Sequence, residues 1–215
     1  YPKGDDMLKT DIPLITTTRW LRKREKLAAK MIAWRCAVLM LIFPLSWTSA
    51  QAHEVLLNAV ANVYFSPKGG CTEAIVSEIN RAKSEILIQA YSFTSRRIAK
   101  ALADANTRGV SIQIIFDKSQ RTARQSAAAY TSRNGIPTFI DRAHAIAHNK
   151  VMIIDKLTVI TGSFNFTKAA EESNAENLLV VRSSGLAQFY RANWNQHRRH
   201  SVEYNGRDAK LSQYN

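Results

Sequence analysis

Two short apolar stretches separated by an amphipathic one constrain the fold of this chain more than any other feature. Residues 85–91 and 110–116 are rich in isoleucine and flanked by polar residues, as expected for strands buried inside a sheet. Between them, residues 98–105 place apolar side chains at positions i, i+3, i+4 and i+7, and Gly109 follows as a helix stop. The order strand, helix, strand predicts an α/β unit with parallel neighbouring strands.

The same alternation extends along residues 59–200. It predicts further strands at 60–65, 136–140 and 177–182, and helices at 71–83, 121–133 and 186–197. Residues 147–154 and 157–161 are predicted to form a hairpin around an Asp155-Lys156 turn. We therefore expect an α/β sandwich of one domain, with a mixed, mostly parallel sheet and helices on both faces. The last helix is expected to bury Leu186, Phe189, Tyr190 and Trp194.

The first 52 residues are predicted to lie outside this domain. Arg35, the apolar run 37–43 and the small-residue site Ala50-Gln51-Ala52 make 31–52 a predicted signal peptide, cleaved before His53. Residues 1–30 are interpreted as an upstream segment, 53–200 as the folded domain and 201–215 as a polar tail. The expected location is periplasmic or secreted, with no stable membrane anchor after cleavage. The alternative is an uncleaved anchor, although the run is shorter than the ~20 residues of a spanning helix.

The charge of the chain suggests a polyanionic partner. The net charge of the 215 residues is +13, and the part after residue 52 keeps 21 basic against 13 acidic residues, a net charge of +8. Nucleic acid and an anionic membrane surface both fit this charge, as does a basic solvated surface without a ligand.

One segment carries a recognisable chemical pattern, H-x-K-x4-D-x6-G-S-x-N. It is formed by His148, Lys150, Asp155, Gly162, Ser163 and Asn165. Six fixed positions match by chance on the order of once in 10⁷ to 10⁸ starting points. On a strand, His148 and Lys150 project from the same face, so a nucleophile and a cation share one site.

The rest of the pattern suits a phosphodiester substrate. Ser163 and Asn165 offer a hydroxyl and an amide to phosphoryl oxygens, and Gly162 permits close backbone approach. Lys150 can neutralise the charge of the phosphate, so no metal or other cofactor is expected. His144 and His148 at i, i+4 would bind a metal only on a helix, and neither His144 nor His53 has support from a motif.

These residues, with 91–94 and 161–170, resemble the phospholipase D superfamily. The resemblance spans roughly residues 56–200 and is greatest to small, secreted, plasmid-borne bacterial endonucleases with one copy of the motif. It implies that His148 forms a covalent phosphohistidine and that a second histidine protonates the leaving oxygen. Because one chain has one motif, a homodimer with a shared active site is implied. Glu176 would orient the histidine, and Asp155 is assigned a structural role.

The motif defines the bond that is attacked but not the substrate. We expect nucleic acid, DNA with RNA as an alternative, cut with little sequence specificity because phosphate contacts carry no base information. Candidate phosphate contacts after the strand ends are Arg96, Arg97, Lys118, Arg121 and Arg124. The alternatives are a phospholipase or phosphatidyl-transferase, with an apolar patch around the site, and a basic nucleic-acid-binding module without catalytic activity.

Overall fold

The computed structural model describes residues 59–206 of the chain. The predicted upstream segment and signal peptide, and the last nine residues, lie outside the described residues. Among the residues that are described, no helix has the length and apolarity to cross a membrane.

A single eight-stranded sheet forms the centre of the domain, in the order β1-β7-β6-β5-β2-β3-β4-β8. The strands are β1 (Val60–Ser66), β2 (Glu85–Ala90), β3 (Ser111–Asp117), β4 (Thr138–Asp141), β5 (Lys150–Ile154), β6 (Thr158–Gly162), β7 (Glu176–Arg182) and β8 (Ser201–Glu203). The predicted hairpin is present as β5 and β6, with Asp155 and Lys156 at positive φ in the turn. The α/β class and the mixed sheet are confirmed.

The expectation of mostly parallel strands is wrong. Only β2 with β3 and β3 with β4 pair in parallel, and the other five pairings described are antiparallel. Strand-helix-strand crossovers produce the two parallel pairs, as the sequence pattern indicated. Strand β1 has the same local pattern, yet it pairs with β7 from the far end of the chain. Long-range pairing of this kind leaves no local signal in the sequence.

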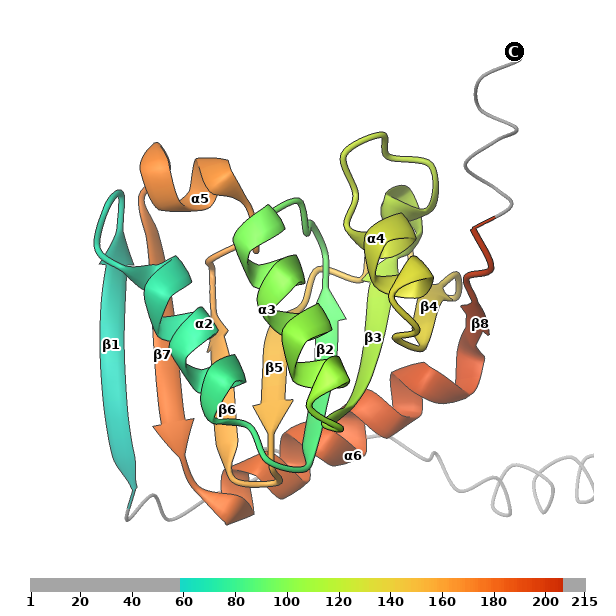
Figure 1. Cartoon of the computed structure of the whole chain (residues 1–215). Helices are drawn as coiled ribbons and strands as arrows, with labels where there is room; N and C mark the ends of the chain where they lie inside the picture. Colours follow the sequence, from blue (N-terminus) through green and yellow to red (C-terminus); the bar gives the residue numbers. More distant parts are fainter. Residues whose placement is uncertain (1–58, 207–215) are drawn as a thin grey trace, which may run out of the picture. The chain divides into compact units, whose positions relative to one another are not determined.

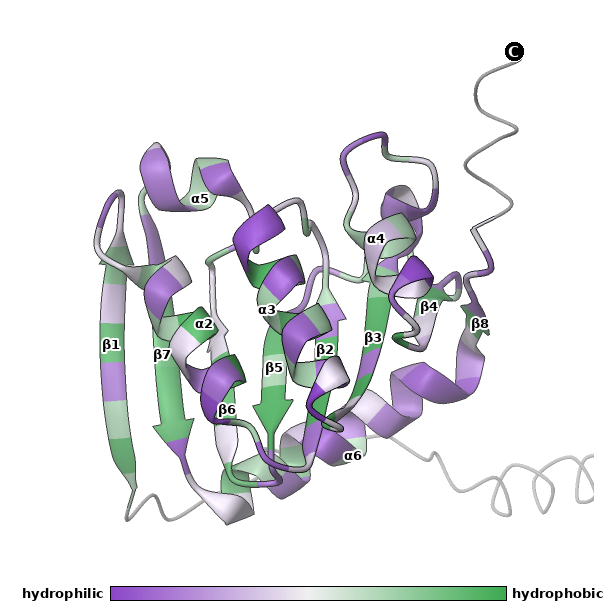
Figure 2. Cartoon of the chain, viewed as in Figure 1, coloured by the Kyte–Doolittle hydropathy of each residue, from purple (hydrophilic) through white to green (hydrophobic). Residues whose placement is uncertain are grey.

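The helices cover both faces of the sheet (Figure 1). They are α2 (Cys71–Arg81), α3 (Arg96–Thr107), α4 (Ala128–Arg133), α5 (Lys168–Glu172) and α6 (Ser184–His200), with a 3₁₀ turn η1 (Lys118–Arg121). Helices α2, α3 and α4 lie over one face, and α6 crosses the other. In Figure 2 the central strands are largely hydrophobic and the helices carry the hydrophilic residues.

Alternate residues along the strands separate two hydrophobic cores. Ile86 and Ile88 face the core under α2 and α3, whereas Leu87 faces the core under α6. This two-residue alternation explains why the strands are apolar almost throughout. On the α6 side, the indole N–H of Trp194 donates a 3.0 Å hydrogen bond to the carbonyl oxygen of Ile88.

Three sequence-based predictions need correction: one helix, the start of the tail and the buried face of α6. The helix expected at 121–133 is divided: η1 begins after Asp117, whose carboxylate accepts from the Ser119 N–H, and α4 begins only at Ala128. Residues 201–203 form β8 on β4 and are not part of a tail. Phe189 is 40% exposed, so α6 buries a narrower stripe, with Ala187 and Trp194 as its buried residues.

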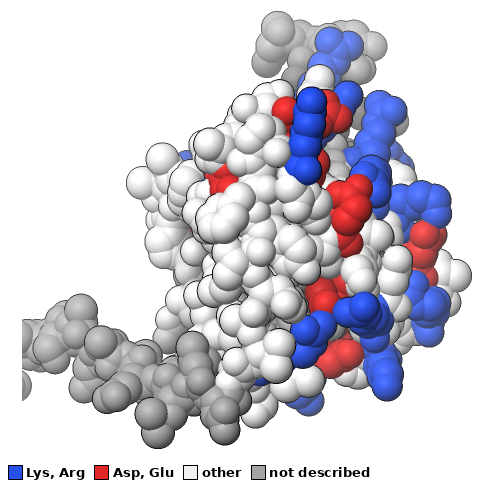
Figure 3. All heavy atoms as spheres, turned by 90° about the vertical axis from the view of Figure 1, so that its left-hand side faces the viewer, with Lys and Arg blue, Asp and Glu red and all other residues white. Residues whose placement is uncertain are grey.

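The β1 edge of the sheet carries few charged side chains. Strand β1 contains no charged residue, and the view onto this edge is mostly uncharged, with lysine, arginine, aspartate and glutamate side chains gathered toward one side (Figure 3). Val60, Val63 and Phe65 are exposed along the strand. The charged side chains of the domain are therefore unevenly distributed.

Candidate active site

The two halves of the motif meet at one end of the sheet. Lys150, the first residue of β5, pairs with Ala90, the last residue of β2. Gly162, the last residue of β6, pairs with Leu178 near the start of β7. Because β5, β6 and β7 are neighbours, segments separated in the sequence are brought to the same edge of the sheet.

His148 and Lys150 lie beside Tyr91. The exposed His148 precedes β5, and its ring centroid lies 4.4 Å from that of Tyr91. The Lys150 side chain is buried, with the residue 6% exposed, and its Nζ lies 4.8 Å from the centre of the Tyr91 ring. Lys150 Nζ also donates a 2.8 Å hydrogen bond to the carbonyl oxygen of His148. The cation thus holds the backbone of the residue that is the candidate nucleophile.

The environment of Lys150 disfavours its charged form. Burial lowers the pKa of its ammonium group below the usual lysine range, and the negative charge of Glu176 partly opposes this effect. An ammonium group has three N–H donors, and the His148 carbonyl oxygen takes one of them. A phosphate entering the site would provide both the counter-charge and the acceptors that this ammonium group needs.

The strand alternation expected for β5 is present. Val151 and Ile153 face the core under α6, and Met152 and Ile154 face the core under α2 and α3. His148 itself precedes the first strand residue, so its placement depends on the loop as well as on the strand.

Gly162 allows β6 to pass close to β7. A Cβ atom at this position would lie 2.3 Å from the carbonyl oxygen of Asn177, and its φ of +145° also disfavours other residues. The close approach lets the hydroxyl oxygen of Ser163 accept from the Asn177 backbone N–H at 3.0 Å. Ser163 is therefore tied to β7 immediately after Glu176.

Asn165 and Glu176 have roles that remain predictions. The side-chain oxygen Oδ1 of Asn165 is buried without a hydrogen-bond partner. The carboxylate of Glu176 accepts a 3.1 Å hydrogen bond from Asn174 Nδ2, and it acts on Lys150 through its charge. Contact with phosphate by Ser163 and Asn165, and orientation of His148 by Glu176, remain predictions.

Asp155 lies at the other end of β5 from Lys150. Its carboxylate accepts hydrogen bonds of 2.8–3.0 Å from the backbone N–H groups of Lys83, Ser84 and Glu85 and from the Ser84 hydroxyl. Burial raises the pKa of Asp155, but these hydrogen bonds outweigh it and hold the pKa below its usual range. Its contacts brace the segment that enters β2 and place it away from the reacting residues.

Sequence reasoning missed two carboxylates that hold the loop before His148. Asp117 and Asp141 end β3 and β4 and pair in register. Asp117 Oδ2 accepts from the Ala147 N–H at 2.7 Å, and Asp141 Oδ1 accepts from the Ala143 N–H at 3.0 Å. The loop that leads to His148 is thus fixed near both ends. An aspartate at the end of each of two successive strands was the available signal.

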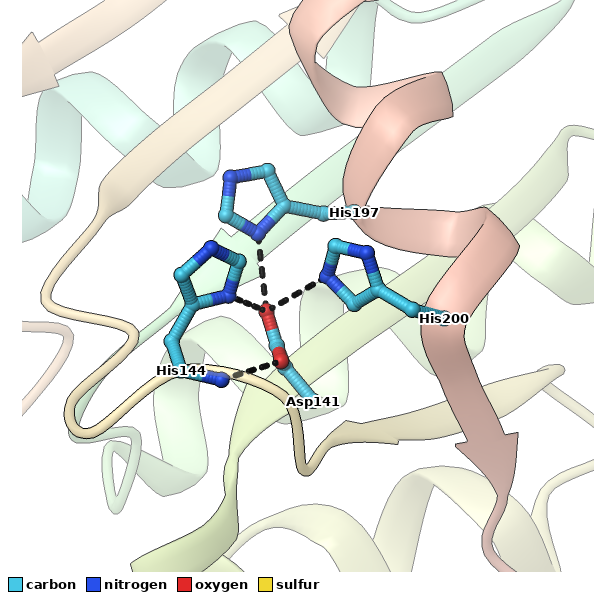
Figure 4. Close-up of side chains that lie close together, drawn as sticks. All are labelled: Asp141, His144, His197 and His200. Carbon is cyan, nitrogen blue, oxygen red and sulfur yellow. Dashed lines mark hydrogen bonds and ion pairs between the residues drawn. The ribbon is translucent and has the colours of Figure 1, made fainter. Parts of the chain in front are cut away.

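Spacing in the sequence indicates no metal site, but the described residues include one cluster of three histidines and a carboxylate. Asp141, His144, His197 and His200 place their ligand atoms within 4.8 Å of one another (Figure 4). His144 is at i, i+4 to His148 in the sequence, but in the structure it lies with the two histidines of α6. The signal that could have found the cluster is His197 and His200 at helical i, i+3 spacing near the end of α6.

A broad groove of about 1020 Å³ lies over α3, α4 and α5. Its lining includes three of the candidate phosphate contacts, Arg96, Arg97 and Arg124. Arg97 already forms an ion pair with Glu73. Lys118 and the remaining candidate, Arg121, lie on η1. Three of the five candidates therefore line this groove, and one of those three is already paired with a carboxylate.

Comparisons with known proteins agree with this fold and motif. A family model described as "Cardiolipin synthase, PLD-like domain" matches residues 75–198. A protein named phospholipase D from Rickettsia felis is 42% identical over 139 residues, which cover 65% of this chain and 70% of that protein. Matches to four further Rickettsia proteins of the same name cover 63–65% of their lengths.

Solved structures give the same result. The chain is 41% identical to Nuc from Salmonella typhimurium, a phospholipase D family member, with a TM-score of 0.65; the match covers 68% of this chain and 98% of Nuc. NucT from Helicobacter pylori is 25% identical with a TM-score of 0.63, over 68% of this chain and 99% of NucT. The chain belongs to the phospholipase D superfamily of phosphodiesterases.

Proposed function

We propose that this protein hydrolyses phosphodiester bonds of nucleic acid, DNA or RNA, with His148 as the nucleophile. The observation that carries the proposal is the exposed imidazole of His148 beside the buried ammonium of Lys150, which is hydrogen-bonded to the backbone of the same histidine. A phosphodiester repels nucleophiles through its negative charge, and a desolvated cation at the point of attack offsets that repulsion.

The reaction proceeds in two displacements. A ring nitrogen of His148 attacks phosphorus, a P–N bond forms, and the bond from phosphorus to the leaving oxygen breaks. A protonated histidine donates its proton to that oxygen. Water then attacks the phosphohistidine, gives its proton to the second histidine and breaks the P–N bond, which restores both residues. Lys150 supplies positive charge to the phosphoryl oxygens throughout.

The second histidine is proposed to be His148 of another copy of the chain. Each chain carries one copy of the motif, so a two-fold dimer would supply both histidines to one site. Mixed dimers test this assembly. A dimer of one wild-type and one His148→Ala chain should lose nearly all cleavage, whereas independent sites would retain half of the wild-type rate.

Nucleic acid is favoured as substrate by charge. The region after residue 52 has a net charge of +8, and arginines line the groove over α3, α4 and α5. The second candidate is a phospholipid, which the name of the Rickettsia relatives supports. Ile146, two residues before His148, is 60% exposed and would suit an apolar substrate.

Cleavage of plasmid DNA in excess EDTA, with the His148→Ala variant as control, tests the proposed chemistry. We expect nicking that persists in EDTA and disappears in the variant. Phospholipid vesicles are assayed in parallel with the same two proteins. Release of the lipid headgroup without any DNA cleavage would overturn the assignment of nucleic acid.

Export is proposed from the segment at 31–52. Its apolar run and Ala50-Gln51-Ala52 site support cleavage before His53 and a periplasmic or secreted product. N-terminal sequencing of protein from a bacterial host tests this proposal. A chain that retains residues before His53 in every cell fraction would contradict it.

A further inference from the structure

We propose that Asp141, His144, His197 and His200 form a binding site for a divalent transition-metal ion, with zinc as the preferred occupant. The four residues converge from separate segments of the fold: Asp141 ends β4, His144 lies in the loop before His148, and the other two lie near the end of α6 (Figure 4). This proposal does not depend on the substrate that the enzyme cleaves.

The geometry centres on one carboxylate oxygen. Asp141 Oδ2 lies 2.9 Å from His144 Nδ1, 2.8 Å from His197 Nδ1 and 3.3 Å from His200 Nε2. In a tetrahedral zinc site with bonds of about 2.0–2.1 Å, neighbouring ligand atoms are separated by about 3.3 Å. The oxygen-to-nitrogen distances are close to that separation. All four ligand atoms lie within 4.8 Å of one another, and the wider separations would have to shorten as an ion binds.

The carboxylate is fixed before any ion arrives. Asp141 is fully buried, and its second oxygen, Oδ1, accepts from the backbone N–H groups of Ala143 and His144. Because Oδ1 is held by the backbone, Oδ2 is the oxygen that faces the three imidazoles and is free to bind an ion.

The histidines leave the site accessible from solvent. The side chains of His144 and His200 are 46% and 35% exposed, whereas that of His197 is 13% exposed. The rings also lie against one another, with centroids 4.6–5.4 Å apart. Three imidazoles and one carboxylate supply four protein ligands. This number fills all coordination positions of a structural zinc ion, whereas calcium and magnesium prefer oxygen ligands.

Metal binding replaces the hydrogen bonds within the cluster. Each ligating nitrogen gives up its proton to solvent or carries it on the other ring nitrogen, and the lone pair then binds the ion. The ion would connect α6, β4 and the loop that leads to His148. Its expected effect is to stabilise that loop, without taking part in the proposed phosphoryl transfer.

Zinc binding by the full chain tests the site directly. After equilibrium dialysis against Zn²⁺, we expect one bound zinc per wild-type chain and an affinity at least 100-fold lower for the His144→Ala, His200→Ala double variant. The His148→Ala variant is the matched control and should bind zinc as the wild type does. Equal affinity of the double variant and the wild type, or no stoichiometric zinc in the wild type, would overturn the proposal.

Two further measurements separate loss of the site from loss of the fold. Bound Co²⁺ should give the intense visible absorption of a tetrahedral complex in the wild type and not in the single His200→Gln variant, whose far-UV circular dichroism should be unchanged. Zn²⁺ should raise the Tm of the wild type but not that of this variant. The same Tm increase in both proteins would contradict the site. If the wild type binds no zinc but still cleaves DNA in EDTA, the metal site is wrong and the proposed function stands.

Discussion

At the Asp155 end of β5, a carboxylate accepts four hydrogen bonds, whereas at the other end the buried Lys150 ammonium donates to a single carbonyl oxygen. The amide oxygen of Asn165, on the loop after β6, is buried without a partner. Both ends belong to the same motif and are separated by a strand of five residues. The difference indicates that one end stabilises the fold and the other is prepared for a ligand.

The physical reason lies in how buried polar groups are compensated. A partly buried carboxylate with four donors costs little, because its hydrogen bonds replace those to water. A buried ammonium group with one acceptor is incompletely compensated, and its pKa is lowered as a result. Incomplete compensation is unfavourable for folding but useful for binding an anion. A mutation at the Lys150 end should therefore reduce activity without loss of stability, and a mutation at the Asp155 end should reduce stability without loss of activity.

Lys150→Met should have the largest effect on activity. Methionine keeps most of the side-chain volume and removes the charge, so we expect cleavage to fall by about 10³-fold or more. Because the buried ammonium is disfavoured, the variant should be as stable as the wild type or more stable, by about 0.5–2 kcal/mol. Urea unfolding and plasmid cleavage measure the two quantities. A variant that is clearly less stable would show that Lys150 supports the fold.

Gly162→Ala, at the end of the sheet that carries the active site, should reduce both stability and activity. The new Cβ would meet the Asn177 carbonyl oxygen at 2.3 Å, so β6 and β7 must separate and the Ser163 contact must change. We expect a loss of about 1–3 kcal/mol in unfolding free energy and a further loss of cleavage by the folded protein. Gly109→Ala is the matched control, since Gly109 also has positive φ but nothing lies within 4 Å of its Cβ position. Equal losses in both variants would mean that close strand approach is unimportant.

Asp155→Asn should reduce stability and leave catalysis intact. Loss of the ionic acceptor weakens the hydrogen bonds to residues 83–85, which we expect to cost about 2 kcal/mol. The pKa of Asp155 is lowered in the folded state, so its contribution is present above the unfolded carboxyl pKa and is lost as pH falls through the folded pKa. The stability difference from wild type should therefore be full at pH 7 and shrink in acid. If the cleavage rate per folded molecule fell as strongly as in Lys150→Met, Asp155 would have a catalytic role and not only a structural one.

The sequence predicted the elements that depend on local patterns. The β5–β6 hairpin, α3 and the parallel β2–β3 pair all follow from spacing and turn residues. The pairing of β1 with β7 and of β8 with β4 depends on contacts between distant segments. Such pairings have no periodic signal, and for that reason the parallel content of the sheet was overestimated.

The candidate site was predictable to a similar extent. The motif identified Lys150 and Gly162 because their chemistry is encoded in consecutive segments. Tyr91 and Asp117 were not assigned roles, because each reaches the site through strand order rather than through sequence spacing. The histidines near the end of α6 meet Asp141 only after the sheet and helix have packed. Residues whose contacts are long-range are the ones that sequence reasoning missed.

Glu176→Gln should have the smallest effect, seen in the pH dependence of cleavage. The negative charge of Glu176 raises the pKa of Lys150 against the effect of burial, so its removal lowers that pKa further. Lys150 must be protonated to neutralise the phosphate, and the alkaline limb of the activity profile should therefore move to lower pH in the variant. If Glu176 also orients His148, the maximal rate should fall as well, because a neutral amide replaces the charged acceptor of the imidazole.

Glu171→Gln provides the matched control for this measurement. Glu171 accepts from the backbone N–H groups of Gly70 and Thr72 and has no assigned role in charge compensation of Lys150. Its replacement should leave the alkaline limb where it is in the wild type. A shift of the limb to higher pH in Glu176→Gln, or the same shift in both variants, would show that the Lys150 charge is controlled by other groups. A shift confined to Glu176→Gln would show that Glu176, at the start of β7, helps to keep Lys150, at the start of β5, protonated.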